Sequence, residues 1–295
     1  NLVVWPESKP VNFEVKRGEI VGVTGLDGNG QDDFVKILAG VQEAHGGTTE
    51  ILDTNENFTK YSSLENAKKN GISFVSGDRK KEGILPNLSI YENLVVPLYK
   101  KTSRAGFLGF IDWLELNGIF EWEVDRLSIK TGPRDNLIGS LSGGNQQKVM
   151  IARSFAQHPK VLILNDPARG IDVSTKRDLY VHLRNYVEEG NTVIFLSSEL
   201  EEFIGLCPKV MVFRNGTVFD IFENEKINAD TLLEGMFGQT AGISETFLSS
   251  KSDLNTNTIQ NKQITNENIE QKKIVKIVDF EKENKNKTKI KIKTF

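Results

Sequence analysis

The sequence predicts an α/β fold whose mainly parallel sheet is covered by helices on both faces. Over residues 1–250, short apolar runs rich in Val and Ile alternate with longer helical segments, which is typical of parallel strands joined by crossover helices. The chain has 295 residues, of which 38% are hydrophobic, so it can bury a substantial core. Three of the apolar runs end directly in glycine or polar residues, and we expect functional loops at these strand ends.

Periodicity and turn signals predict the individual elements. After Val210–Phe213, the pair Asn215-Gly216 is typical of a hairpin turn into Thr217–Phe219, so we expect an antiparallel edge on the sheet. A short helix over Ala229–Phe237 is expected to end the fold. The strongest predicted strands are Glu19–Val23, Ile72–Val75, Val161–Leu164 and Thr192–Leu196.

The segment between two of these strands is helical. We expect helices over Tyr91–Tyr99 and Trp113–Leu127, with breaks near Gly106, Gly109 and Gly132-Pro133. This pattern predicts a helical subdomain at about residues 89–140, inserted into a domain that spans residues 1–240.

The C-terminal segment, residues 241–295, differs sharply in composition. Residues 251–295 hold 11 Lys, 7 Asn and only 6 acidic residues, with scattered Ile and Val. Such a segment buries too little apolar surface to offset its chain entropy, so we expect a disordered Lys- and Asn-rich tail. The alternation over Lys289–Lys293 is compatible with an edge strand, but a solvated basic tail is the favoured interpretation.

Composition narrows the functional class. A net charge of -3 and a pI near 5.8 argue against a general nucleic-acid binder, which usually carries a basic stripe. The single cysteine, Cys207, excludes an internal disulfide framework and favours a reducing compartment. No apolar run approaches the roughly 18 residues of a spanning helix, so membrane contact requires a partner. The chain begins at Asn1 and enters a strand pattern almost at once, from which we expect a fragment of a longer protein.

The first chemical feature is a glycine loop, Gly25-Leu26-Asp27-Gly28-Asn29-Gly30-Gln31-Asp32, between a strand and the expected helix Phe34–Leu38. Its spacing resembles a P-loop, in which backbone N–H groups and a helix N-terminus surround phosphate. The P-loop Lys is replaced by Gln31 and the magnesium-binding Ser or Thr by Asp32. Asp32 and Asp33 are expected to cap the helix where phosphate would bind. Taken alone, the loop is equally compatible with an ordinary strand-turn-helix.

The second feature is Leu141-Ser142-Gly143-Gly144-Asn145-Gln146-Gln147-Lys148, followed by an amphipathic run. It resembles the signature motif of ABC ATPases, whose common form is Leu-Ser-Gly-Gly-Gln. The hydroxyl of Ser142 and the bare amides of Gly143 and Gly144 at a helix N-terminus can form a phosphate clamp. A glycine-rich helix start without a ligand is the alternative.

Two further strand ends carry polar residues at positions where the resemblance implies catalysis. In P-loop ATPases a buried strand delivers an Asp to magnesium, and in the ABC family a Glu follows and positions water. Asn165 and Asp166 stand at these two positions, which lowers our expectation of fast hydrolysis. Downstream, Arg169-Gly170-Ile171-Asp172 resembles the D-loop that couples two nucleotide sites. Ser198 occupies the position of the switch histidine and cannot carry its positive charge.

A Q-loop-like segment, a tryptophan near the N-terminus and three histidines are further candidate residues. Ser76-Gly77-Asp78-Arg79-Lys80 resembles the Q-loop form found in the second half of sugar-importer ATPases, with Gly77 where Glu is frequent. Trp5 lies where the family has the aromatic that stacks on adenine, although a core or edge aromatic is equally expected. The three histidines, His45, His158 and His182, have no convincing ligand partners and are interpreted as structural or surface residues.

Residues 1–240 therefore resemble the C-terminal nucleotide-binding domain of two-domain ATPases from ribose, galactose and related monosaccharide importers. The nucleoside and basic-membrane-protein branch is nearly as similar. The resemblance implies a P-loop NTPase (RecA-like) fold with the ABC helical subdomain, and ATP and Mg²⁺ as cofactors. It implies catalytic roles for Asp166, Ser198 and Asp78, a weak magnesium contact at Asp32, and ATP contacts at Gly25, Asp27, Gly28, Asn29, Gly30, Gln31, Asp32, Ser142, Gly143, Gly144, Asn145 and Gln146.

The resemblance also implies partners. In the family, ATP lies between two nucleotide-binding domains and contacts the P-loop of one and the signature of the other. We therefore expect an N-terminal nucleotide-binding domain or second ATPase subunit, a transmembrane permease dimer and, indirectly, a periplasmic substrate-binding protein. The expected location is peripheral, on the cytoplasmic face of the bacterial inner membrane. The second hypothesis is a docking module that works independently of nucleotide. A third hypothesis, an ABC protein that acts on ribosomes or DNA, lacks support because the folded part of this sequence has no basic patch.

Overall fold

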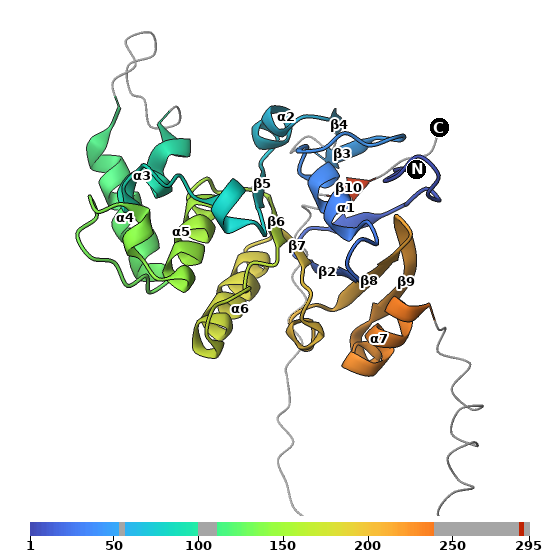
Figure 1. The fold of residues 1–295 in the computed structure, drawn as a ribbon. Coiled ribbons are helices and arrows are strands. Elements are labelled where there is room, and N and C mark those ends of the chain that lie inside the picture. Colours follow the sequence, from blue (N-terminus) through green and yellow to red (C-terminus); the bar gives the residue numbers. More distant parts are fainter. Residues whose placement is uncertain (53–56, 100–110, 239–288, 292–295) are drawn as a thin grey trace, which may run out of the picture.

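The computed structural model describes residues 1–52, 57–99, 111–238 and 289–291. Its centre is a six-stranded sheet with the order β5-β6-β7-β2-β8-β9, in which neighbouring strands are parallel except for the antiparallel β8–β9 hairpin (Figure 1). The predicted parallel sheet with an antiparallel edge is confirmed. The strands are β2 (Ile20–Gly25), β5 (Ile72–Val75), β6 (Val161–Asn165), β7 (Thr192–Leu196), β8 (Lys209–Arg214) and β9 (Thr217–Glu223).

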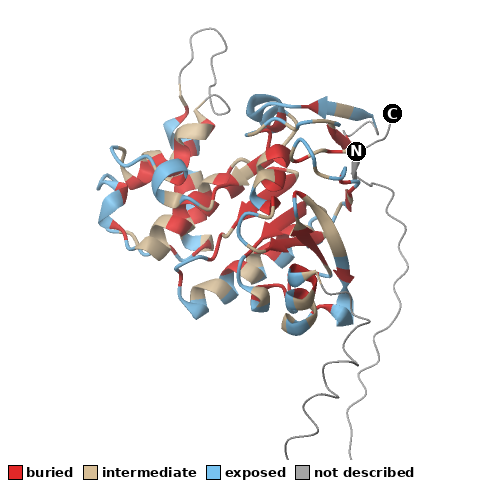
Figure 2. Cartoon of the chain, turned by 45° about the vertical axis from the view of Figure 1, so that its right-hand side comes forward, coloured by how far each residue is buried: buried red, intermediate tan, exposed pale blue. Residues whose placement is uncertain are grey.

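Alternating residues of the central strands face two separate cores, because successive side chains of a strand point to opposite faces. On one face, Val21, Ile163 and Ile194 belong to the cluster that α1 (Gln31–Leu38) covers through Phe34. On the other face, Leu162, Leu164, Val193 and Phe195 belong to the cluster that α5 (Gly143–Phe155) and α6 (Val173–Glu188) cover. Figure 2 shows the buried residues concentrated in the strands and the inward sides of the helices. The sheet edge that carries the strand-end loops is thereby held between two packed layers.

A group of helices lies at one side of the sheet. In Figure 1, α3 (Ile90–Val95) and α4 (Trp113–Arg126) stand with α5, beyond strand β5. The first predicted helix of this region ends early and continues as a 3₁₀ turn, η2 (Val96–Leu98), because Pro97 has no N–H for the helical ladder. The predicted breaks at Gly106 and Gly109 lie outside the described residues. The boundary of a helical subdomain at residues 89–140 stays a prediction.

A second, antiparallel sheet has the order β1-β10-β3-β4. Its strands are β1 (Glu14–Lys16), β3 (Thr49–Leu52), β4 (Phe58–Tyr61) and β10 (Lys289–Lys291), and α2 (Leu64–Lys69) follows β4. β10 pairs with both β1 and β3, which corrects the expectation of a solvated segment for these three residues. Paired on both sides, β10 is an interior strand of this sheet and not the edge strand that the alternation suggested. The remaining part of the predicted tail, 241–288 and 292–295, lies outside the described residues.

Turn chemistry explains where the last elements begin and end. Asn215 and Gly216 have φ angles of 52° and 72°, the left-handed pair that a tight β-hairpin requires. Helix α7 (Ala229–Phe237) starts with a capping box at Asn228 and ends at the left-handed Gly238. Short helical turns complete the described chain: the π-turn η1 (Arg79–Gly83) and the 3₁₀ turns η4 (Ile138–Ser140), η5 (Leu200–Glu202) and η6 (Asn224–Lys226).

Candidate functional site

Three of the predicted loops meet at one edge of the central sheet. They follow β2, β6 and β7, which are parallel and adjacent in the order β6-β7-β2, so their carboxyl ends lie side by side. The structure thereby brings together Gly25–Asp32, Asn165-Asp166 and Ser197-Ser198. Asp32 and Asn165 are 133 residues apart in sequence and share a hydrogen bond.

The glycine loop is closed by its own side chains. Gly30 adopts a left-handed conformation (φ 96°), and α1 starts after it without a side-chain cap. The Gln31 side chain is buried, and its Nε2 donates to the carbonyl oxygens of Gly25 and Leu26 at 3.2 and 3.0 Å. Its Oε1 is buried and has no hydrogen-bond partner. The Gln31 side chain is therefore turned inward and supplies no cation to a bound phosphate chain.

A direct hydrogen bond joins the two side chains at which the resemblance implies magnesium chemistry. Asn165 Nδ2 donates to Asp32 Oδ1 at 3.0 Å, at the junction of α1 and the end of β6. The Asn165 amide also lies against Gly77, where an added Cβ would be 3.1 Å from its Oδ1. Within the described residues, no group of three or more His, Cys, Asp and Glu could hold a metal ion. Because a nitrogen of Asn165 faces Asp32, the residues present do not fit a dedicated magnesium site.

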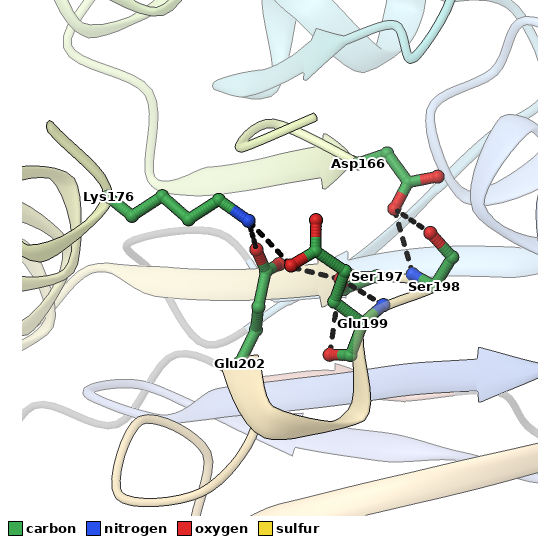
Figure 3. Close-up of polar contacts among 6 residues, drawn as sticks. All are labelled: Asp166, Lys176, Ser197, Ser198, Glu199 and Glu202. Atoms are coloured by element: carbon green, nitrogen blue, oxygen red, sulfur yellow. Dashed lines mark hydrogen bonds and ion pairs between the residues drawn. The ribbon is translucent and has the colours of Figure 1, made fainter. Parts of the chain in front are cut away.

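Asp166 is held by the loop that follows β7 (Figure 3). Its Oδ1 accepts hydrogen bonds from the Ser198 backbone N–H at 2.8 Å and from Ser198 Oγ at 3.2 Å. Burial raises the pKa of the Asp166 carboxyl, and the two bonds from Ser198 lower it in part. Asp166 also adopts a left-handed conformation (φ 43°), and such backbone strain is concentrated at functional sites. The predicted catalytic residues Asp166 and Ser198 therefore do contact each other.

Asp78, the third predicted catalytic residue, has a local structural role. Its side chain accepts from the backbone N–H of Lys81 at 3.1 Å and caps η1. The next residue, Arg79, belongs to the predicted Q-loop-like segment, but the sequence assigned it no role of its own. Arg79 Nη1 donates to the Gly143 carbonyl oxygen at 3.1 Å and so ties the Q-loop-like segment to the start of α5.

The signature segment forms the N-terminus of α5, as predicted. Ser142 is the N-cap residue, and its exposed Oγ accepts from Asn145 N at 3.4 Å and Asn145 Nδ2 at 3.0 Å. Gln146 Nε2 donates to the Leu141 carbonyl oxygen at 3.0 Å. In Figure 1, α5 stands with α3 and α4 at one side of the sheet, away from α1. The signature and the glycine loop therefore do not form one site within this chain.

An open cavity of about 670 Å³ lies beside Asp32, Asn165 and Asp166. Ser142 and the two glycines that follow it are not among its lining residues, although Gln147 of the same helix is. Over the whole lining, four positive side chains balance four negative ones. Its lining residues are Asp32, Lys36, Ser76, Gly77, Asp78, Arg79, Lys80, Glu82, Gln147, Asn165, Asp166, Arg169 and Gly170.

Trp5 contacts the first turn of α1, just after the glycine loop. Its indole Nε1 donates to Asp33 Oδ2 at 2.8 Å. A Cβ added at Gly216 would be 2.7 Å from Trp5 Cε3, so the ring packs on the turn of the β8–β9 hairpin. The side chain thus joins the start of α1 to that turn. Its N–H and part of its ring are already engaged by protein groups.

Comparison with known proteins gives consistent sequence matches. The profile of the family described as ABC transporter matches residues 8–169. The ribose import ATP-binding protein RbsA of Bacillus cereus is 37% identical over 224 residues, which cover 76% of this chain and 44% of that protein. The galactose/methyl galactoside import ATP-binding protein MglA of Mannheimia succiniciproducens is 34% identical over 78% of this chain and 44% of the relative. The chain thus spans less than half the length of these relatives.

Solved structures show the same fold. A dimeric ATP-binding cassette in a post-hydrolysis state, bound to ADP and Pi, matches with a TM-score of 0.63 and 23% identity over 73% of this chain and 89% of that one. A nucleotide-free cassette from an ABC transporter matches with a TM-score of 0.62 and 17% identity, over 76% and 87% of the two chains. At these identities the likeness establishes the architecture alone, and it agrees with the predicted P-loop NTPase fold.

Proposed function

The chain belongs to the ABC transporter family, and from that premise we propose that it is the second ATP-binding half of an ABC importer for sugars. In this role it couples ATP binding and hydrolysis to transport. Its own nucleotide site is impaired, and its signature segment serves an ATP bound to the other half. The names of the ribose and galactose relatives support the sugar class, and a nucleoside importer is the alternative within the same family.

The contrast between two segments carries the proposal. Ser142 caps α5 with its hydroxyl exposed, and the following glycines leave backbone amides at a helix N-terminus, which is a general anion-binding geometry. At the glycine loop, by comparison, Gln31 is folded inward and Asp32 is bonded to Asn165. The signature can therefore act on a phosphate that comes from outside the chain, while the loop has lost its cation and gained a carboxylate.

The proposal includes partners and a place in the cell. The described residues contain no helix long and apolar enough to cross a membrane. We place the chain at the cytoplasmic face of the bacterial inner membrane, bound to a transmembrane permease dimer and to an N-terminal nucleotide-binding domain or second ATPase subunit. A periplasmic substrate-binding protein delivers the sugar to this assembly. Magnesium, in this scheme, accompanies the ATP held mainly by the other half.

Substitutions in the assembled transporter test the division of labour. Gly143→Asp puts a carboxylate beside the proposed phosphate clamp, where an added Cβ is already 3.0 Å from Arg79 Nη2, and is expected to abolish transport-coupled hydrolysis. Gly139→Asp is the matched control, because a Cβ at Gly139 meets no atom within 4 Å. Gln31→Ala is expected to leave hydrolysis nearly unchanged. Unchanged hydrolysis in Gly143→Asp, or its loss in Gln31→Ala, contradicts the proposal.

A docking module without a nucleotide role is the second candidate, favoured by the self-contained hydrogen bonding of the glycine loop. Equilibrium binding of a non-hydrolysable ATP analogue to the assembled pair of halves separates the two candidates. The ATPase proposal expects binding to weaken in Ser142→Ala. Binding that is independent of Ser142 favours the docking module.

A further inference from the structure

Lys176, on the second turn of α6, forms two short ion pairs that the sequence did not indicate (Figure 3). Its Nζ lies 2.6 Å from Glu199 Oε2 and 2.7 Å from Glu202 Oε1. The Lys176 side chain is only 15% exposed and that of Glu202 only 6%, so solvent screens this pair far less than a surface pair. Glu199, by contrast, is 52% exposed and forms the outer side of the cluster.

The same cluster fixes the backbone after β7. The second carboxylate oxygen of Glu202 accepts from Ser197 Oγ at 2.6 Å, and Ser197 Oγ accepts from the Glu199 backbone N–H at 3.0 Å. The Lys176 ammonium thus holds two carboxylates of one short turn, and both carboxylate residues contact Ser197. The turn over residues 197–202 is closed around these contacts.

Ser198 lies between the two held residues, Ser197 and Glu199. Both of its hydrogen bonds, from N–H and Oγ, go to Asp166 Oδ1. The orientation of the Ser198 amide depends on the dihedral angles of its neighbours, which the cluster restrains. Helix α6 begins at its N-cap Asp172, the last residue of the D-loop-like segment. A continuous chain of contacts therefore runs from the D-loop-like segment through Lys176 to Asp166.

Loss of the ammonium would disturb this turn more than an ordinary surface substitution. Burial by itself lowers the pKa of Lys176, but the hydrogen bonds and charges of Glu199 and Glu202 outweigh it, and the net pKa of the ammonium is raised. Without the ammonium, the buried Glu202 carboxylate keeps its bond from Ser197 and its interaction with the Tyr180 hydroxyl, but it has no cation and lies beside the charge of Glu199. Unpaired buried charges are strongly unfavourable, so the turn is expected to open toward solvent.

We propose that Lys176 is a positioning residue that ties helix α6 to the turn 197–202 and so keeps Ser198 bonded to Asp166. Lys176 touches neither Asp166 nor the cavity and acts through Glu199, Glu202 and Ser197. The inference rests on the proposed function in two respects: Asp166 is taken as the carboxylate that faces the nucleotide, and the D-loop-like segment before α6 is taken to couple the two nucleotide sites. Its structural content, the dependence of the Ser198–Asp166 contact on Lys176, needs no nucleotide to be tested.

Hydrogen exchange of the Ser198 amide, followed by NMR on the full chain, measures this dependence. In Lys176→Met, which keeps the length and apolar stem of the side chain, Ser198 exchange is expected to become roughly tenfold faster. Lys176→Arg keeps a cation and is expected to retain most of the protection. Arg177→Met is the matched control, since it removes a positive charge from the next, exposed residue of the same helix and is expected to leave exchange unchanged.

The amides of β2, paired with parallel strands on both sides, serve as the internal reference for global stability. The proposal is overturned if Ser198 exchange in Lys176→Met equals that of the wild type, or rises only as much as the β2 amides do. It is also overturned if Lys176→Arg exchanges as fast as Lys176→Met. If Lys176→Met does not fold, Glu199→Gln carries the test, with a smaller but selective increase expected at Ser198. Loss of sugar transport without a change in Ser198 exchange would leave the proposed function standing and reject this inference.

Discussion

Restoring the two side chains that the glycine loop has lost should create a nucleotide site in this chain. The double variant Gln31→Lys/Asp32→Thr supplies the cation and the hydroxyl of a complete P-loop. The fold is expected to tolerate it, because Gln31 Nε2 already donates to the carbonyl oxygens of Gly25 and Leu26, and a Lys ammonium can use the same acceptors. Asn165 loses its bond to Asp32 but faces the open cavity, where water can replace that partner.

The expected gain in MgATP binding free energy follows from the two charges that the double variant changes. Two unit charges about 4 Å apart interact by roughly 4 kcal/mol at an effective dielectric of 20. The variant removes the repulsion between the Asp32 carboxylate and the ATP phosphates and adds an attraction between the new ammonium at position 31 and these phosphates. Solvent at the open cavity and the cost of burying the ammonium reduce the sum of the two effects. We expect a net gain of about 3 kcal/mol in MgATP binding, which is roughly a hundredfold lower Kd.

Isothermal titration calorimetry of the full chain with MgATP tests this estimate, with millimolar binding or none expected for the wild type. Gln42→Lys/Glu43→Thr is the matched control, because it makes the same chemical changes and the same change in net charge just beyond the far end of α1. A folded double variant that binds no better than this control would refute the reasoning. Micromolar binding of MgATP by the wild type would equally show that Gln31 and Asp32 do not impair the site.

Three further predictions concern stability. Burial raises the pKa of Glu123 from 4.5 to about 7, although Arg126 acts to lower it. The folded state therefore binds this proton more tightly than the unfolded state, so the stability of the fold falls as the pH rises from about 4.5 to about 7. In Glu123→Gln, urea unfolding should lose this pH dependence, worth up to about 3 kcal/mol between pH 4 and 8, and an unchanged pH profile would contradict the assignment. Ser142→Ala removes the α5 cap and should cost about 0.5–1 kcal/mol in urea unfolding, whereas Ser142→Thr should cost much less; equal losses would show that the cap contributes little. Gly216→Ala should lower stability by about 2 kcal/mol in the same assay, because the new Cβ meets Trp5 Cε3 at 2.7 Å. Gly190→Ala, at a glycine that is also left-handed but has open space around it, should cost about 1 kcal/mol. Similar losses in the two variants would mean that the Trp5 contact adjusts freely.

The central sheet could be predicted closely because each of its strands and turns is encoded in a short stretch of neighbouring residues. The β5 and β7 strands were predicted at their observed residues, since each is a short, mostly apolar run rich in β-branched and aromatic residues, which is typical of a strand buried on both faces of a sheet. The hairpin at Asn215-Gly216 and the helix Ala229–Phe237 followed from turn and cap chemistry in the same way. The small antiparallel sheet escaped prediction, because its strands are short and β10 comes from a segment whose composition favours solvation.

The sequence by itself determined which chemical groups are present at each strand end: an amide at Gln31, a carboxylate at Asp32, an amide at Asn165 and a hydroxyl at Ser198. These identities already predicted the loss of the P-loop cation and the survival of the signature. Only the tertiary structure decided which groups meet. Asp32 bonds to Asn165 across 133 residues, Arg79 to Gly143 across 64, and Lys176 to Glu199 across 23. The physical reason is that direct hydrogen-bonded contacts form only when the two heavy atoms are about 3 Å apart. Such distances between remote residues are set by the packing of helices and strands, which no local pattern encodes.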